Sequence, residues 1–233
     1  MQALRGTQDI LPKQVYKWNY IENMIRHLCA LYGYGEIRTP MFEDTRLFLR
    51  GIGDTTDVVT KEMYTFSDRG GRSITLRPEN TASVVRSFLE HKMYGDQQVQ
   101  KVFYIGSMFR YDRPQAGRYR EFHQFGVEIL GAKSPIADAE CIALAYDLFK
   151  RLGLNELKLY INSIGHSECR NTYRRKLIEF FEPKTEYLCD DCKERLHKNP
   201  LRILDCKEDC CKHASIGAPE ITDYLCDDCK EHF

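Results

Sequence analysis

A strand-like alternation of polar and apolar residues is the strongest pattern in the chain, and it runs through residues 102–131 on both sides of an arginine-rich loop. Successive side chains of a strand point to opposite faces, so every second residue shares a face. One face is therefore predicted to carry Gly106, Met108, Arg110 and Asp112 from the first strand, with Phe122, Gln124, Gly126 and Glu128 from the second. Phe125, Val127 and Ile129 lie behind. A guanidinium, carboxylates, a carboxamide and an aromatic ring on one face favour a site for a phosphate-bearing ligand, because arginine binds phosphate oxygens bidentately.

Apolar residues that recur at helical spacing predict four helices. The first opens with Asp9 as an N-cap-like residue and Pro12 in the first turn. Its inner face is predicted to be Val15, Trp18, Ile21, Ile25, Leu28 and Leu31. The second helix starts near Pro78 and is predicted to press Ala82, Val85, Phe88 and Leu89 on a sheet. The third spans residues 134–152, with an inner face of Ile136, Ala139, Ile142, Ala143, Tyr146 and Phe149, and the fourth spans residues 168–181.

Shorter strands complete the predicted fold. Residues 63–66 and 73–76 flank the sequence DRGGR and predict a hairpin with a Gly-Gly turn. The sequence YGYGEIRTPMFE predicts a turn that leads into a short strand ending at Pro40, and LKLYINSIG alternates like a further strand. Antiparallel strands with helices around them predict an α+β fold, an antiparallel sheet flanked by helices.

Composition bounds the class of protein. The 233 residues are 42% apolar, which supports a hydrophobic core. The 34 basic residues balance 34 acidic ones, so nucleic acid could be bound only by a local basic patch. No stretch is long enough for a transmembrane helix and the N-terminus lacks the apolar run of a signal peptide, so we expect a cytoplasmic protein without membrane association. Composition changes after Pro183, which predicts a main domain over residues 1–183 and a cysteine-rich insertion segment over residues 184–233.

The cysteine-rich segment contains two CxxC pairs. Cys189 and Cys192 form the first, Cys226 and Cys229 form the second, and Cys206, Cys210, Cys211 and His213 lie between them. Two CxxC pairs can offer four thiolates to one tetrahedral ion, so the four paired cysteines are predicted to bind a structural Zn²⁺. The gap of 33 residues between the pairs is longer than in common zinc ribbons. Reduced cysteines without metal remain the alternative.

The alternating segment also carries a family resemblance. The sequence FRYD, the loop RPQAGRYR and the strand EFHQFGVEILG resemble motif 2 of class II aminoacyl-tRNA synthetases. The residues are most similar to the form of this motif found in histidyl-tRNA synthetases. The resemblance begins at LRGTQDILP and extends into the cysteine-rich segment. It implies an incomplete class II synthetase-like catalytic core, in which Arg110 holds the α-phosphate of ATP and Phe122 stacks on adenine. Asp112 stands at the acidic position of the motif, and Arg118 of the loop joins this implied ATP site.

The sequence RPENTA resembles the RPEGTA motif that lines the amino-acid pocket of the family. This implies that histidine is bound by Glu79, Asn80, Thr81, Arg110, Gln124 and Glu128. Asn80 stands where the family commonly has glycine. Glu79 has a structural alternative, because an acidic residue also stabilises the positive end of a helix. His123 is expected on the opposite face of its strand and is not assigned as a general base.

The implied activity is that of a histidine–tRNA ligase. L-histidine is activated by ATP with Mg²⁺ to histidyl-adenylate and then transferred to tRNA(His), with Arg110 as the catalytic residue. Motif 1 corresponds to residues 34–43 and implies a homodimer. Family members continue with a histidine-specific segment, motif 3 and an anticodon-binding domain, none of which occurs in these 233 residues. Activity of this chain alone is therefore expected to be impaired.

Two alternatives from other classes remain. The first is a histidine-binding regulatory paralogue that partners ATP phosphoribosyltransferase in histidine biosynthesis. Such a protein can lose the ATP arginine, whereas FRYD and its loop are intact here. The second is a zinc-ribbon-like binding module, which the long enzyme-like body before the cysteine-rich segment disfavours.

Overall fold

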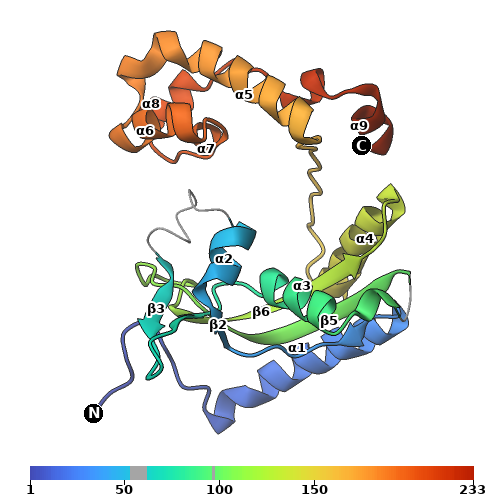
Figure 1. Cartoon of the computed structure of the whole chain (residues 1–233). Coiled ribbons are helices and arrows are strands. Elements are labelled where there is room, and N and C mark those ends of the chain that lie inside the picture. The colour runs from blue at the N-terminus through green and yellow to red at the C-terminus, as the bar shows by residue number, and fades with distance from the viewer. Residues whose placement is uncertain (53–61, 96–97) are drawn as a thin grey trace. The chain divides into compact units, whose positions relative to one another are not determined.

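A computed structural model describes residues 1–52, 62–95 and 98–233, and the chain forms two compact units (Figure 1). The first unit is Met1–Leu157 and the second is Lys158–Phe233. The sequence placed the boundary later, at residue 183. The difference arises because helix α5 (Ser167–Phe181) packs its buried face in the cysteine-rich unit, where Leu177 and Phe181 share a core with Leu188.

Two ten-residue strands form the centre of the first unit. β5 (Gln100–Phe109) and β6 (Glu121–Leu130) pair antiparallel along their whole length, and β1 (Gly35–Glu36) adds to β5 in parallel. The register pairs Tyr104 with Gly126 and Gly106 with Gln124. The predicted alternation is confirmed, because Phe125, Val127 and Ile129 pack in one core cluster while Met108 and Phe122 pack in another.

Helices cover both faces of this strand pair (Figure 1). α1 (Pro12–Leu31) and α4 (Pro135–Arg151) share a core with Phe103 on one face. On the other face, α3 (Thr81–Glu90) contributes Val84, which packs with Tyr104 and Met108. Together with the sheets, these helices confirm the predicted α+β class.

A second small sheet has the strand order β2-β4-β3 and is antiparallel throughout. Its strands are β2 (Phe42–Asp44), β3 (Tyr64–Ser67) and β4 (Ser73–Leu76). The predicted hairpin is confirmed, and its turn closes because Asp68 Oδ1 accepts hydrogen bonds from the amides of Gly70 and Arg72 at 2.9 and 2.8 Å. Gly71 has a φ of 78°, a conformation that glycine adopts without strain. Helix α2 (Thr45–Ile52) follows β2 directly.

The structure corrects the predicted inner faces of three helices. In α1 the buried residues are Ile25, Leu28 and Cys29, whereas Leu31 is 62% exposed, and Leu11 rather than Asp9 is the N-cap. In α4 the buried residues are Leu144 and Leu148. The side chains of Val15, Ile21, Ile136, Ile142, Tyr146 and Phe149 are also exposed. Apolar residues surround much of each helix, so periodicity alone did not select the buried stripe.

In α3 the correction changes the chemistry of the buried face. Ser83, Val84 and Ser87 face the interior, and Val85 and Leu89 are exposed. The buried face of the helix therefore combines two serines with one apolar residue. The position of this face matters below, because α3 begins beside the predicted histidine-binding residues.

Short helices build the second unit. After α5 come η3 (Glu182–Tyr187), α6 (Asp190–Lys198), α7 (Leu201–Leu204), α8 (Asp209–Ala214), η4 (Ile221–Tyr224) and α9 (Asp227–His232). The strand predicted for LKLYINSIG does not form, and Leu159, Tyr160 and Ile161 are exposed. An alternating segment becomes a strand only with a pairing partner, and the described residues provide none. No helix in the described ranges combines the length and apolar content needed to cross a membrane.

Candidate functional site

The polar face of the β5–β6 pair brings the two central residues of the predicted ATP site together. Arg110 follows β5 directly, and its guanidinium lies 5.3 Å from the centre of the Phe122 ring on β6. Arg110 Nε donates a hydrogen bond of 2.8 Å to the carbonyl of Pro78. Within the described ranges, the terminal nitrogens of Arg110 have no protein partner. A guanidinium fixed at one nitrogen and free at the others is suited to bind an anion.

The start of α3 lies beside this arginine and meets β6. Thr81 Oγ1 donates a hydrogen bond of 2.7 Å to Glu128 Oε1, so the RPENTA segment contacts the second strand directly. Burial raises the pKa of Glu128 above its ordinary value, and the nearby charge of Glu79 raises it further, against the Thr81 hydrogen bond. Glu128 is thus a half-buried acceptor with only part of its hydrogen-bonding capacity in use.

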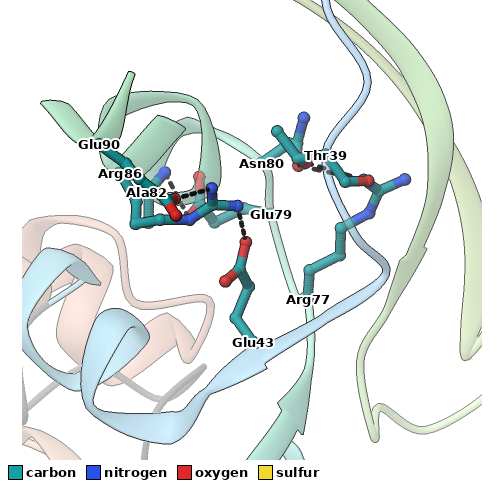
Figure 2. A network of polar contacts seen from close by, with 8 residues as sticks. All are labelled: Thr39, Glu43, Arg77, Glu79, Asn80, Ala82, Arg86 and Glu90. Carbon is teal, nitrogen blue, oxygen red and sulfur yellow. Dashed lines mark hydrogen bonds and ion pairs between the residues drawn. The ribbon is translucent and has the colours of Figure 1, made fainter. Parts of the chain in front are cut away.

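Glu79 has a second task in the fold. One carboxylate oxygen accepts a hydrogen bond of 2.6 Å from the amide of Thr81. The other accepts one of 3.1 Å from the amide of Ala82 (Figure 2). These amides belong to the first turn of α3, where backbone donors lack helical partners. The structural alternative for Glu79, helix N-terminal chemistry, is therefore observed. Glu79 also lines a cavity of about 1060 Å³ together with Thr81 and Arg86.

Asn80 lies away from this cavity in a buried polar cluster. Only 1% of Asn80 is exposed, and its Oδ1 accepts hydrogen bonds from Thr39 Oγ1 at 2.6 Å and Arg77 Nη1 at 3.2 Å (Figure 2). Its Nδ2 is buried without a partner among the described residues. Asn80 thus connects the chain before β2 with the start of α3.

Two residues of the polar face were missed by the sequence analysis. Arg77 is buried, with its Nε donating to the carbonyl of Ser107 at 2.9 Å, and Tyr104 is buried against β6. A side chain at Gly106 would meet Arg77, and one at Gly126 would meet the Tyr104 ring, both within 2.5 Å. The two glycines could have indicated from the sequence that large side chains pack there, because a glycine in a strand often marks close approach by another group.

The side chains of the remaining predicted residues differ in the partners that they contact. Asp112 is paired with Arg118 on the loop, at 3.0 Å between Oδ2 and Nη1. Gln124 Oε1 is buried without a hydrogen-bond partner in the described part of the chain. Because buried acceptors are rarely left unpaired, Gln124 has capacity for a ligand donor. His123 contacts Trp18 of α1, with ring centres 4.5 Å apart, so its predicted orientation away from the site is confirmed.

An ion-pair network supports α3 from its other side (Figure 2). Arg86 donates to Glu43 of β2 and, at 2.8 Å, to Glu90 one turn further along α3. The network fixes the helix against the segment that the sequence assigned to motif 1. It acts on the middle and the end of the helix and does not contribute to the polar face itself.

The comparisons with known proteins agree with this geometry. A family model described as histidyl-tRNA synthetase matches residues 6–169. The histidine–tRNA ligase of Anoxybacillus flavithermus is 65% identical over 209 residues, which cover 89% of this chain and 49% of that protein. The histidine–tRNA ligase of Thermoanaerobacter pseudethanolicus is 60% identical over 100% of this chain and 56% of its own length.

The chain belongs to the histidyl-tRNA synthetase family. It spans about half the length of the curated relatives it matches. Among solved structures, apo S. aureus histidyl-tRNA synthetase is 46% identical with a TM-score of 0.75, covering 100% of this chain and 52% of that one. A Bacillus halodurans protein titled ATP phosphoribosyltransferase regulatory subunit/histidyl-tRNA synthetase has a TM-score of 0.63 over 99% of this chain and 65% of its own. At 21% identity, that likeness shows the fold alone.

In this histidyl-tRNA synthetase family member, the structure does not bring the four predicted zinc ligands together. Cys189 and Cys192 cluster with Cys206 and Cys211, which we call the inner cluster. Cys226 and Cys229 cluster with His166 and Cys169, which we call the outer cluster. The assumption that the two CxxC pairs share one ion was wrong, because each pair faces a different partner pair. Only thirteen residues separate Cys192 from Cys206, compared with 33 between Cys192 and Cys226. The shorter spacing was the better indication of which cysteines share a site.

Proposed function

We propose that this chain carries the ATP- and histidine-binding part of a histidine–tRNA ligase, which activates L-histidine with MgATP and transfers it to tRNA(His). The observation that carries the proposal is Arg110, held at one nitrogen by Pro78 and lying beside the Phe122 ring. A phosphate bound by the terminal nitrogens of the Arg110 guanidinium and a base stacked on the Phe122 ring would lie next to each other. Family membership and the names of the relatives support the same reaction.

In the activation step, the histidine carboxylate attacks the α-phosphorus of ATP and pyrophosphate leaves. Negative charge is redistributed over the phosphoryl oxygens during the attack, so a fixed positive group placed there lowers the barrier. Arg110 is our candidate for that group. ATP enters as its Mg²⁺ complex and is treated as substrate. In the second step, a terminal hydroxyl of tRNA(His) attacks the activated carbonyl and releases AMP.

For histidine recognition we propose Thr81, Gln124 and Glu128, which offer a hydroxyl and two acceptors near the start of α3. The amino group and imidazole of histidine need such acceptors. Glu79 remains a candidate ligand, although two backbone amides already engage its carboxylate. The polar contacts of Asn80 support a structural role, so we do not retain it as a ligand.

For assembly we propose a homodimer with residues 34–43 at the interface. Met41 and Phe42 in this segment are 53% and 55% exposed, which favours coverage by another surface. The exposed loop residues Arg113 and Arg118 are candidates for contact with ATP or the acceptor end of tRNA. Because these substrates are used in translation, we propose the cytoplasm as the site of action.

Histidine-dependent exchange of labelled pyrophosphate into ATP tests the proposed function. The chain is assayed alone and with the carboxyl-terminal half of the Anoxybacillus flavithermus ligase added in trans, with phenylalanine in place of histidine as the control. We expect exchange with histidine only, and more of it with the added half. Binding of histidine without any binding or turnover of ATP in either arrangement would contradict the proposal and favour the regulatory paralogue.

A further inference from the structure

Eight metal-ligating side chains gather in two separate groups in the second unit. We propose that this unit binds two structural zinc ions, one by the four thiolates of the inner cluster and one by the three thiolates and the imidazole of the outer cluster. The four ligand atoms of each cluster lie within 4.8 Å of one another. This inference concerns the folding of the unit and stands independently of the proposed catalytic activity.

The distances between ligand atoms agree with tetrahedral zinc. Zinc bonds of ordinary length place two sulfurs about 3.8 Å apart and a sulfur and a nitrogen about 3.6 Å apart. In the inner cluster, Cys189 Sγ and Cys206 Sγ are 3.9 Å apart. In the outer cluster, Cys169 Sγ and Cys229 Sγ are 4.0 Å apart. His166 Nδ1 lies 3.0, 3.5 and 4.0 Å from the sulfurs of Cys169, Cys229 and Cys226, a range centred near the expected sulfur–nitrogen distance.

Other pairings of these cysteines fit the distances less well. A disulfide requires sulfurs about 2.05 Å apart, roughly half the observed separations. An iron–sulfur cluster holds its thiolates farther apart than a single ion does, because iron and sulfide atoms lie between them. A histidine with three cysteines, or four cysteines, around one point is the ligand set of structural zinc.

The local fold explains why the ligands converge. His166, Cys189 and Cys226 are the N-cap residues of α5, α6 and α9, and each is followed by a cysteine three positions later. The three sequences HSEC, CDDC and CDDC therefore present two ligand side chains at a helix start.

The surroundings of each cluster supply the contacts that metal sites use to orient their ligands. The amide of Cys189 donates to Cys211 Sγ and the amide of Cys226 donates to Cys169 Sγ, both at 3.3 Å. His166 Nε2 lies 3.5 Å from a carboxylate oxygen of Glu168, which leaves Nδ1 to face the sulfurs. A carboxylate on the outer nitrogen is a common partner of a metal-bound histidine.

Net charge is also matched to the ligand sets. A zinc ion with four thiolates carries a net charge of −2, whereas one with three thiolates and a neutral imidazole carries −1. Arg195 donates from Nη1 to Cys192 Sγ at 3.7 Å, so a guanidinium accompanies the more negative inner set. Hydrogen bonds and positive charge near metal-bound thiolates stabilise the site.

The two sites would have different tasks. The inner cluster uses residues between 189 and 211 and stabilises the middle of the unit. The outer cluster joins the start of α5 to α9, and so fixes the two ends of the unit to each other. Two sites also suit a unit of this size, because small domains often need metal to supplement a limited core.

Metal analysis of protein purified without chelator tests the proposal. We expect about two zinc ions per chain in the parent, about one in Cys211→Ser, about one in Cys169→Ser, and about none in the double variant. Cys210→Ser is the matched control, because Cys210 is exposed, adjoins Cys211 and belongs to neither cluster. It should retain two ions. A single zinc that is lost on substituting either Cys192 or Cys229 would overturn the proposal in favour of one shared site.

A second measurement keeps the test decisive if a serine variant does not fold. His166→Ala should lower the zinc content toward one, and His166→Cys should restore it to two, since cysteine supplies the missing ligand. After replacement of zinc by cobalt, Cys169→Ser and Cys211→Ser should give thiolate charge-transfer bands in a ratio of about four to three, because they leave the four-thiolate and three-thiolate sites respectively. Full zinc content and an unchanged cobalt spectrum in His166→Ala would overturn the outer site.

Discussion

The two units of the chain reach a folded state by different means. In Met1–Leu157, β5 and β6 form a continuous ladder, and apolar clusters pack on both of its faces. In Lys158–Phe233, no strand forms and short helices surround a core whose buried residues include three cysteines. The first unit therefore depends on a hydrogen-bonded framework, and the second depends on side chains that can bind metal.

The same contrast separates the chemistry of the two units. The polar face of β5–β6 retains groups without partners among the described residues, such as Gln124 Oε1. The cysteine clusters direct their ligand atoms at each other instead. Unpaired groups on a rigid sheet are suited to a substrate that binds and leaves, whereas converging thiolates are suited to an ion that stays.

The largest expected effect is that of metal removal, which should affect one unit only. Structural zinc in small domains contributes on the order of 10 kcal/mol to folding, so chelation should abolish hydrogen-exchange protection in α5–α9. Protection in β5 and β6 should persist. Mass spectrometry of peptic peptides from both units measures this directly. Equal loss of protection in the two units would show that metal dependence is not confined to the second unit.

The order of metal loss sharpens this prediction. His166 of the outer cluster is exposed, whereas Cys192 and Cys211 of the inner cluster are buried. A chelator should therefore remove zinc in two phases, with the outer ion leaving first. In Cys169→Ser the fast phase should be absent and the slow phase retained.

Arg110→Ala should give the next largest effect, and it should be confined to catalysis. Loss of one preorganised electrostatic contact costs about 3–4 kcal/mol in the transition state, so histidine-dependent pyrophosphate exchange by the chain completed with the carboxyl-terminal half should fall roughly 100- to 1,000-fold. Arg72→Ala is the control, because Arg72 is an exposed arginine paired with Asp68 at the hairpin turn. Exchange within a few-fold of the parent would remove Arg110 from the site.

Core truncations should affect each unit separately. Leu144→Ala and Leu177→Ala remove side chains with exposures of 1% and 0%, and each should cost about 3 kcal/mol. Trp18 is the only tryptophan and lies in the first unit, so its fluorescence reports that unit alone. We expect the urea midpoint measured by Trp18 to fall in Leu144→Ala and to change little in Leu177→Ala. A similar fall in both would show that the units unfold together.

The smallest effect concerns the pH dependence of the first unit. Glu128 has a folded pKa above its ordinary value of 4.5, so its contribution to stability is full below that pH and is lost as pH rises through the folded pKa. Glu128→Gln does not titrate and should gain stability relative to the parent between about pH 4 and about pH 7. The gain should stay below about 1 kcal/mol, because the group is only half-buried.

The urea midpoint from Trp18 fluorescence, measured at both pH values, checks this prediction. Glu194→Gln is the control, because Glu194 lies in α6 of the second unit. It should leave the Trp18 transition unchanged at both pH values. A relative loss of stability in Glu128→Gln as pH rises would show that the environment of Glu128 favours the charged form.

Local patterns in the sequence were enough to predict the strand pair and its two faces. A strand has a period of two, so Phe125, Val127 and Ile129 were assigned to one face without knowledge of their neighbours. The same alternation assigned Arg110 and Phe122 to one face, and their side chains do lie near each other. The hairpin at Asp68 followed from its Gly-Gly turn, which also depends only on adjacent residues.

Only the tertiary structure decided which helix faces are buried, what Asn80 contacts and how the cysteines group. Apolar residues surround much of α1 and α4, so the buried stripe depends on what packs against them. Asn80 sits in the RPENTA segment, yet Thr39 and Arg77 engage its side chain within the fold. The ligands of the outer cluster come from both ends of the second unit, and no local spacing specifies that meeting. Contacts within a few residues are determined by the chain itself, whereas contacts across many residues depend on how the intervening helices pack.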